Sequence, residues 1–175
     1  MKKIDPARYT HITDVAKEAS EIGLAPKIHE VDTTKQQIVM DYKPHQKWPA
    51  YEEYPEPYRA TMKALAHFHQ TMKHKCQVCT PQDDPMSGYP QTLIHGNLTQ
   101  KTVLLTPYPI FVNFEASTIG NPYNDIVTFT AHLAPSERQS LFTEYLGHAP
   151  TTEERSLFDV VNLSFQSAHT SNAIP

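Results

Sequence analysis

Polar side chains that could do chemistry are concentrated between residues 93 and 125. They are His95, Asn97, Thr102, Asn113, Glu115 and Asp125. An imidazole can transfer protons, and carboxylate or amide oxygens are the ligands that a hard divalent cation prefers. Glu115 follows Asn113 closely in sequence, so the two could coordinate a cation together. The competing interpretations are structural: a buried imidazole at His95, a salt bridge or hydrogen bond at Glu115, and a helix cap at Asp125.

A second candidate for chemistry is the pair Cys76 and Cys79, which forms a C-x-x-C motif. A redox motif of this kind lies between a strand and a helix, whereas residues 80–85 have the composition of a loop. A zinc site could recruit His69 and His74, but this spacing matches no standard ligand set. Two cysteines in or near a loop are therefore the favoured interpretation.

Glycine is scarce in this sequence. The 175 residues include five glycines, and no two of them lie closer than eight residues apart. A loop that cradles phosphate groups needs several glycines in one tight turn, because its backbone N–H groups must approach the anion closely. The sequence therefore contains no Walker A loop, no dinucleotide-binding fingerprint and no kinase-type glycine-rich loop.

The composition is that of a globular protein, with 39% hydrophobic and 10% aromatic residues. Its length suits one domain, with or without a small appendage. The net charge is −4 and the basic residues are scattered, so we expect no nucleic-acid partner. No apolar run reaches the roughly 18 residues of a membrane span, and the first eleven residues contain no apolar signal segment. We therefore expect no membrane contact and a cytoplasmic location.

Hydrophobic spacing predicts a mixed chain of the α+β class. In the first half it predicts a helix over residues 8–22, strands over 27–32 and 37–42, and a helix from Tyr58 to about Lys73. Pro and Tyr residues make the segment between the second strand and the second helix a loop. The helix over 8–22 is expected to stop at Gly23.

The second half of the chain is predicted to begin with short strands and to end with helices. The strands cover 92–95, 103–106 and 110–114, and the last two form a hairpin around Pro107-Tyr108-Pro109. A helix capped by Asp125 is expected to run to about Leu133. Two further helices are expected to start at the capping boxes Ser136-x-x-Gln139 and Thr151-x-x-Glu154.

The order of these motifs resembles the aminoglycoside phosphotransferase and choline kinase group, which has a protein-kinase-like fold. The pattern of that group is H-G-D-x-x-x-x-N, a hairpin, D-[FW]-E and then G-x-P-x-x-D. The corresponding runs here are 95–102, 113–115 and 120–125. Residues 64–69 resemble the helix that ends in a Leu-His pair before the catalytic loop, and Tyr145 lies where the group often has a tyrosine.

The resemblance implies a role for each matched position, and the sequence departs from the group where the chemistry would take place. The base position holds Asn97 in place of Asp, and the two metal-ligand positions hold Thr102 and Asn113 in place of Asn and Asp. An amide cannot accept the proton, and neutral oxygens hold Mg²⁺ more weakly than a carboxylate does. Loss of the base alone typically costs about 10²–10⁴ in rate. His95 and Asp125, which would shape and brace the catalytic loop, are retained.

The resemblance also implies a division of the chain into two parts. Residues 1–43 correspond to a remnant of the small lobe, with one helix and two strands, and residues 44–175 to a mostly helical large lobe with the catalytic-loop hairpin. In the group, a glycine-rich hairpin and a Lys-bearing strand precede the first helix, whereas here seven residues precede residue 8. Asp41, Tyr42 and Lys43 fall at the hinge-like position that would contact the nucleotide cofactor.

Three functional hypotheses follow from these residues. The favoured one is a pseudokinase, a binding or regulatory module that transfers no phosphoryl group and needs no cofactor. The second is an active small-molecule kinase that uses ATP and Mg²⁺ at an unconventional site, or at a site completed by another chain. The third is a structural α+β domain that is unrelated to kinases.

The two predicted strands at 27–42 also suggest a partner. A two-stranded sheet has open edges, and open edges recruit other strands. We therefore expect self-association, or a protein partner, at residues 27–42.

Overall fold

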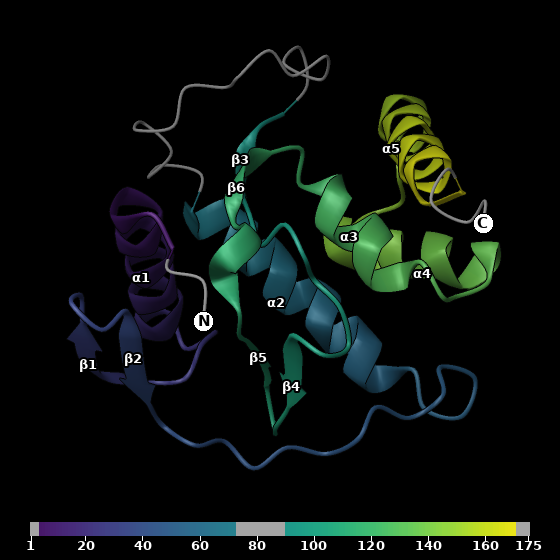
Figure 1. Cartoon of the computed structure of the whole chain (residues 1–175). Coiled ribbons are helices and arrows are strands. Elements are labelled where there is room, and N and C mark those ends of the chain that lie inside the picture. Colours follow the sequence, from purple (N-terminus) through teal and green to yellow (C-terminus); the bar gives the residue numbers. More distant parts are fainter. Residues whose placement is uncertain (1–3, 73–89, 171–175) are drawn as a thin grey trace.

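The structure is a computed structural model that describes residues 4–72 and 90–170 (Figure 1). The described residues form five α-helices, one short 3-10 helix and three separate two-stranded sheets. In chain order the elements are α1 (Pro6–Glu21), β1 (Ile28–Asp32), β2 (Gln37–Met40), α2 (Glu56–Met72), β3 (Thr92–Ile94), β4 (Val103–Leu105), β5 (Pro109–Phe111), η2 (Phe114–Ala116), β6 (Thr118–Gly120), α3 (Tyr123–Thr130), α4 (Pro135–Leu146) and α5 (Thr152–Thr170).

Helix α1 forms where the spacing of apolar residues predicts it. Asp5 caps its start, because the carboxylate accepts hydrogen bonds from the backbone N–H groups of Ala7 (3.0 Å) and Arg8 (3.2 Å). Its apolar face is buried, with Ala19 fully enclosed. The helix ends before Gly23, whose φ of +76° is a conformation that glycine adopts without strain.

Strands β1 and β2 form the predicted antiparallel hairpin, which we call the ribbon. Val31 pairs with Ile38, and Glu30 pairs with Val39, while the register shifts between Ile28 and Glu30. The ribbon lies beside α1 (Figure 1). Val31 and Ile38 are half-buried, whereas Val39 is exposed, so the ribbon has a covered face and an open face.

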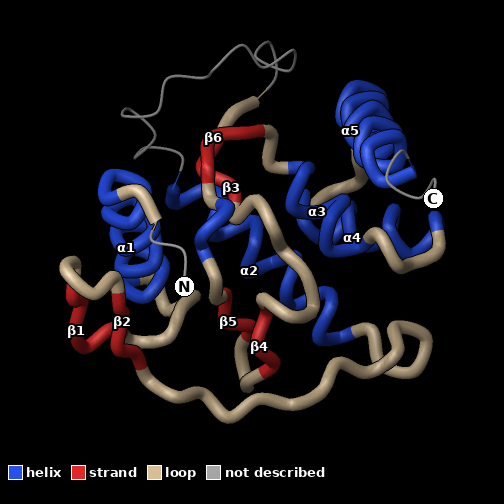
Figure 2. Tube along the Cα trace, in the orientation of Figure 1, coloured by secondary structure: helices blue, strands red, loops and turns tan. Residues whose placement is uncertain are grey.

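Helix α2 runs through the middle of the molecule and carries much of the core (Figure 2). Its buried face is the predicted one, although the helix begins at Glu56 rather than Tyr58. Strands β3 and β5 pack on this helix, as does α4. Residues 73–89, which include the C-x-x-C motif, lie outside the described residues.

The predicted hairpin at 103–114 is present as β4 and β5, with Val103 opposite Phe111. The second strand is shorter than expected, because Asn113 adopts a left-handed conformation (φ +65°, ψ +60°) and starts η2. The pairing of β3 with β6 was not predicted. β6 has three residues and no alternating pattern, so its sequence does not indicate a strand. The pairing with β3, in which Leu93 lies opposite Ile119, defines it as one.

The C-terminal helices confirm one of the two predicted capping boxes. Thr151 and Glu154 exchange the expected hydrogen bonds at 2.8 Å and 3.2 Å. The box at Ser136 is wrong, because α4 starts at Pro135 and the Glu137 carboxylate accepts from the N–H of Ala134 instead.

The expectation that Asp125 caps a helix is also wrong. α3 begins at Tyr123, so Asp125 lies inside its first turn, and its carboxylate is used elsewhere. No helix in the described part of the chain is long and apolar enough to cross a membrane.

One hydrophobic core connects α1 with the helices that follow it. Aromatic side chains fill much of it, and Phe142 and Phe158 stack with their ring centroids 4.3 Å apart. The largest fully buried aromatic side chains are Tyr58, Phe68, Phe111, Phe129, Phe142 and Phe158. This core holds α2, β3, the β4–β5 hairpin and α3 together, and these are the elements that carry the candidate site.

Candidate functional site

The loop after β3 lies so close to η2 that it requires a glycine at the point of contact. Gly96 has a φ of +79°, and a Cβ atom at this position would lie 2.2 Å from the carbonyl oxygen of Ala116. A side chain is therefore excluded both by the backbone conformation and by the close approach of the two segments. Gly96 fixes the turn that presents residues 95–102.

Asp125 lies beneath this loop and binds its backbone. The side chain is 1% exposed, and its carboxylate accepts hydrogen bonds from the N–H groups of His95 (2.7 Å) and Gly96 (2.9 Å). Burial acts to raise the pKa of Asp125, but the hydrogen bonds from the His69 ring and from the backbone N–H of His95 outweigh it and lower that pKa. A buried carboxylate thus holds the loop in place, as a brace would.

His69 connects Asp125 to helix α4. Its Nε2 lies 3.1 Å from Oδ2 of Asp125, and its Nδ1 lies 2.9 Å from the hydroxyl of Tyr145. A carboxylate only accepts hydrogen bonds, so Nε2 carries the proton and Nδ1 accepts from Tyr145. Burial raises the pKa of Tyr145, which keeps the hydroxyl protonated as a donor. The result is a continuous chain from Tyr145 through His69 and Asp125 to the loop.

Sequence reasoning noted the Leu-His helix and Tyr145 separately, as points of resemblance, but did not connect them to Asp125. His69 lies 56 residues before Asp125 and 76 before Tyr145. The one available signal was the presence of polar groups on helix faces that are otherwise apolar. That signal indicates a buried partner without identifying it.

His95 is fully buried and serves the loop rather than solvent. Its Nε2 lies 2.9 Å from the carbonyl oxygen of Val112, and its Nδ1 lies 3.4 Å from the N–H of Asn97. The carbonyl requires a proton on Nε2, and Nδ1 then accepts the weaker bond from Asn97. Burial lowers the pKa of His95 and favours this neutral form. The contacts are those of a structural histidine that joins β5 to the loop.

Asn97 and Asn113, which the resemblance matches to the base position and to one metal-ligand position, are both exposed. The left-handed backbone of Asn113 is one that asparagine and aspartate tolerate better than most residues. Glu115 is exposed as well, and its backbone carbonyl accepts a hydrogen bond from the Arg8 guanidinium of α1.

Thr102 differs from these residues because it is turned into the loop. It is 4% exposed, and its hydroxyl accepts a hydrogen bond from the N–H of Thr99 at 2.8 Å. The same hydroxyl lies 3.0 Å from the carbonyl oxygen of Asn97, to which it donates. It therefore stabilises the loop internally. Residues 4–72 and 90–170 contain no group of three or more His, Cys, Asp and Glu side chains that could hold a metal ion.

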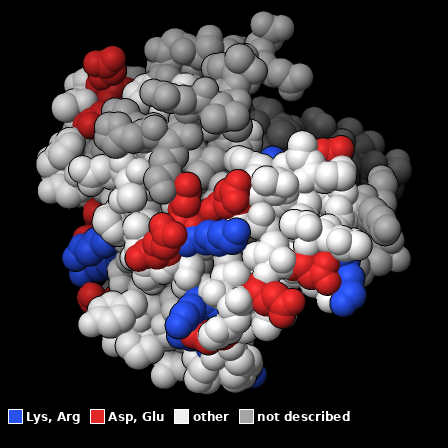
Figure 3. Space-filling model, turned by 90° about the vertical axis from the view of Figure 1, so that its left-hand side faces the viewer, with Lys and Arg blue, Asp and Glu red and all other residues white. Residues whose placement is uncertain are grey.

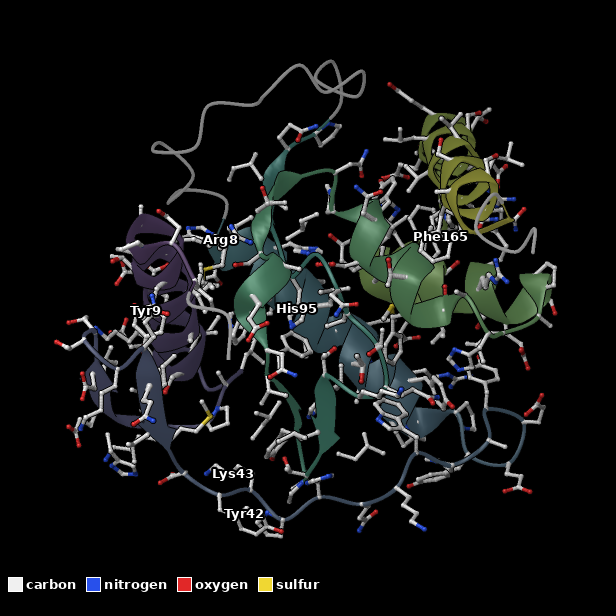
Figure 4. All side chains as sticks on the ribbon, viewed as in Figure 1. Arg8, Tyr9, Tyr42, Lys43, His95 and Phe165 are labelled. Carbon is white, nitrogen blue, oxygen red and sulfur yellow. The ribbon has the colours of Figure 1, made fainter. Side chains whose placement is uncertain are left out.

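The hinge-like residues lie on the segment that follows β2, away from His95 (Figure 4). The carboxylate of Asp41 contacts His29 at 2.6 Å and Lys43 at 3.4 Å, and the hydrogen bond from His29 is the main cause that lowers the pKa of Asp41. Tyr42 is 84% exposed. Further along, the indole of Trp48 donates to the carbonyl of Val103 at 3.1 Å, which ties this segment to the β4–β5 hairpin.

Comparison with known proteins identifies the fold. No protein-family model and no curated protein matches the chain. Among solved structures, a choline/ethanolamine kinase family protein from Mesorhizobium loti matches with a TM-score of 0.70 and 14% identity, over 87% of this chain and 66% of that one. The fold is that of a protein-kinase-like small-molecule phosphotransferase.

Two further kinases support this assignment. Choline kinase LicA from Streptococcus pneumoniae matches with a TM-score of 0.64 and 12% identity, over 95% of this chain and 72% of that one. An amicoumacin kinase, solved with AMP-PNP and Ca²⁺, matches with a TM-score of 0.57 and 13% identity, over 82% of this chain and 63% of that one. The chain thus spans about two thirds of the length of these proteins.

These matches confirm the predicted protein-kinase-like fold, in place of an α+β fold unlike that of kinases. The division of the chain at residue 43 stays a prediction, and so do the roles of the individual site residues.

Proposed function

We propose that this chain is a pseudokinase of the small-molecule kinase fold, which acts as a binding or regulatory module and transfers no phosphoryl group. The observation that carries the proposal is a contrast between retained and replaced side chains. Asp125 and His95 hold the loop at residues 95–102, while Asn97 and Asn113 present amides at the positions where the chemistry would need carboxylates.

The chemistry of the outer side chains supports the loss of activity. In a kinase, a carboxylate orients and deprotonates the acceptor hydroxyl, and an Asn and an Asp hold Mg²⁺ against the phosphates. Here the amide of Asn97 cannot take up a proton, and Asn113 offers the cation a neutral oxygen. The hydroxyl of Thr102 is already bonded within the loop. Loss of the base would lower the rate by about 10²–10⁴. Loss of the charge stabilisation that a bound metal supplies to the transition state would remove several kcal/mol more.

The retained scaffold supports a role for the loop in the absence of catalysis. A buried carboxylate costs free energy unless its partners are present, so the Asp125 network must be kept intact for the chain to fold. A loop held in this way can still present a surface to a ligand or a protein. A nucleotide could bind without donating a phosphoryl group, and ATP with Mg²⁺ is the ligand to test. Such binding would stabilise the folded chain by mass action.

The deciding experiment measures phosphoryl transfer from ATP by the full chain. Choline, ethanolamine and amicoumacin, which the names of the matched kinases suggest, serve as acceptors, and water serves as the acceptor for ATP hydrolysis. We expect no Mg²⁺-dependent product above background. Turnover that disappears in Asn97→Ala would overturn the proposal and favour an active kinase with an unconventional site.

A thermal-shift titration with ATP, with and without Mg²⁺, defines what the loop still binds. An Mg²⁺-dependent shift that is larger in Asn97→Asp/Asn113→Asp than in the unmodified chain would support a cation site weakened by the amides. Asn124→Asp is the control for an added carboxylate, because Asn124 is exposed and the single negative charge that this variant gains lies away from residues 97 and 113 in sequence. An equal shift in the control would assign the effect to general charge.

A further inference from the structure

The edges of the ribbon are a feature that the proposed function does not use. Among the described residues, no third strand pairs with β1 or β2. A two-stranded hairpin alone is only marginally stable in water, and its edges expose unpaired backbone groups. Helix α1 covers one face of the ribbon and leaves both edges uncovered by strands.

The two edges of the ribbon differ in how they are protected. β1 contains His29, Glu30 and Asp32, and its register shifts between Ile28 and Glu30. Charges and irregular pairing are the devices that keep an edge strand from recruiting other strands. β2 has the sequence Gln-Ile-Val-Met, without a charge, a proline or a bulge of its own. The edge of β2 is therefore the unprotected one.

Exposed apolar side chains are concentrated at the same place. Of the seven large hydrophobic side chains exposed in the described residues, three lie within residues 39–42. They are Val39 (51% exposed), Met40 (40%) and Tyr42 (84%). Elsewhere on this side of the molecule acidic and basic side chains are interspersed (Figure 3). An uncharged edge next to exposed apolar side chains is the composition of a strand-pairing interface.

We propose that β2 pairs with β2 of a second copy of this chain, so that two ribbons form one four-stranded antiparallel sheet about a two-fold axis. Such an axis places each strand against its own copy, so that the charges of one strand lie near the same charges on the other. A symmetric pair through β1 would bring Glu30 and Asp32 close to their own copies. A symmetric pair through β2 brings no charges together and covers Val39.

The register follows from the same symmetry. A two-fold axis perpendicular to a sheet keeps each side chain on its own face, so one residue of the strand stands directly opposite its copy. Val39 is the most exposed apolar side chain of β2 and gains most from that position. A four-residue strand makes an interface at the small end of the range for specific complexes, so we expect a dimer that dissociates at roughly micromolar concentrations.

Sedimentation velocity over a concentration series tests the proposal with the full chain. Val39→Lys places two ammonium groups opposite each other and should weaken the dimer about tenfold or more. Leu163→Lys is the matched control, because Leu163 is 61% exposed on α5 and far from the ribbon in sequence. This control should dimerise like the unmodified chain. Circular dichroism and a thermal melt verify that both variants fold, which the exposure of both sites predicts.

Disulfide trapping gives an independent readout. In a background with Cys76→Ser and Cys79→Ser, Val39→Cys should form a disulfide-linked dimer under mild oxidation, whereas Leu163→Cys should form no disulfide-linked dimer. A chain that stays monomeric at high concentration, or a dimer that Val39→Lys leaves unchanged, would overturn the proposal. Neither result bears on phosphoryl transfer, so its failure is distinguishable from failure of the proposed function.

Discussion

The two sides of the loop at residues 95–102 differ in burial and in what their side chains do. On the inner side, Asp125, His69 and His95 are enclosed, and each has defined hydrogen-bond partners. On the outer side, Asn97 and Asn113 are exposed. A buried polar group that loses its partner destabilises the fold, whereas an exposed one exchanges its partner for water. Folding therefore constrains the inner side strongly and the outer side weakly.

This difference explains how a chain with a kinase fold could lose catalytic activity and remain folded. The groups that would perform catalysis lie where substitution has little effect on stability. The groups that shape the loop lie where substitution threatens the whole fold. Substitutions at the buried and at the exposed positions should therefore differ strongly in their effect on the free energy of unfolding.

The largest effect is expected from Asp125→Ala. It leaves the N–H groups of His95 and Gly96 and the imidazole of His69 without their acceptor, and the groups of His95 and His69 are buried. Breaking a buried charged network in this way costs about 3–5 kcal/mol. Urea unfolding of the variant and the unmodified chain measures this difference.

The pH dependence of that difference is its control. Because the pKa of Asp125 is lowered on folding, its stabilisation is present above the unfolded pKa of about 3.9 and is lost as the pH falls through the lower folded value. The two unfolding free energies should therefore converge at acidic pH. A constant difference down to the lowest pH would show that the carboxylate charge does not carry the effect.

The second largest effect is expected from Gly96→Ala. The added methyl group would collide with the carbonyl of Ala116, and the alanine would have to adopt the positive φ of Gly96. We therefore expect the free energy of unfolding to fall by about 2–4 kcal/mol. Gly147→Ala is the control, because it has a similar φ of +73° but no atom within 4 Å of the new Cβ. It should lose about 1 kcal/mol. Equal losses would mean that backbone strain alone, without the close approach, fixes Gly96.

A smaller effect is expected from Tyr145→Phe. The variant keeps the ring and removes the donor to Nδ1 of His69, which leaves a buried acceptor unsatisfied at a cost of about 1–2 kcal/mol. Tyr42→Phe, at an 84% exposed position, should change stability by less than about 0.5 kcal/mol. Thermal unfolding of both variants measures the contrast. A stability loss in Tyr42→Phe as large as that in Tyr145→Phe would argue against the relay to Asp125.

The smallest effect is expected on the outer side of the loop. Asn97→Asp and Asn113→Asp are isosteric changes at exposed positions, and the left-handed backbone of Asn113 accepts aspartate. Each should change the unfolding free energy by less than about 0.5 kcal/mol. Urea unfolding at neutral pH measures it. A loss comparable to that of Asp125→Ala would contradict the division of the loop into a constrained and an unconstrained side.

Local structure was largely predictable, because it depends on short-range spacing. The faces of α1 and α2 follow from apolar residues at helical intervals, and the β4–β5 hairpin follows from two apolar runs around Pro107 and Pro109. The error at Asp125 occurred because a longer-range contact intervenes. Aspartate is a residue type that often caps helices, but the carboxylate of Asp125 accepts hydrogen bonds from the backbone of residues 95 and 96, which lie about 30 residues earlier.

The candidate site was predictable in its residue types but not in its connections. The sequence alone determines that amides occupy positions 97 and 113 and that no glycine-rich loop is present in these 175 residues. Only the tertiary structure decides that Tyr145, His69 and Asp125 form one hydrogen-bonded chain and that Gly96 touches Ala116. The physical reason is that spacing along the chain reports which face of an element is buried. Which buried groups then meet depends on how α2, α3 and α4 pack around the common core.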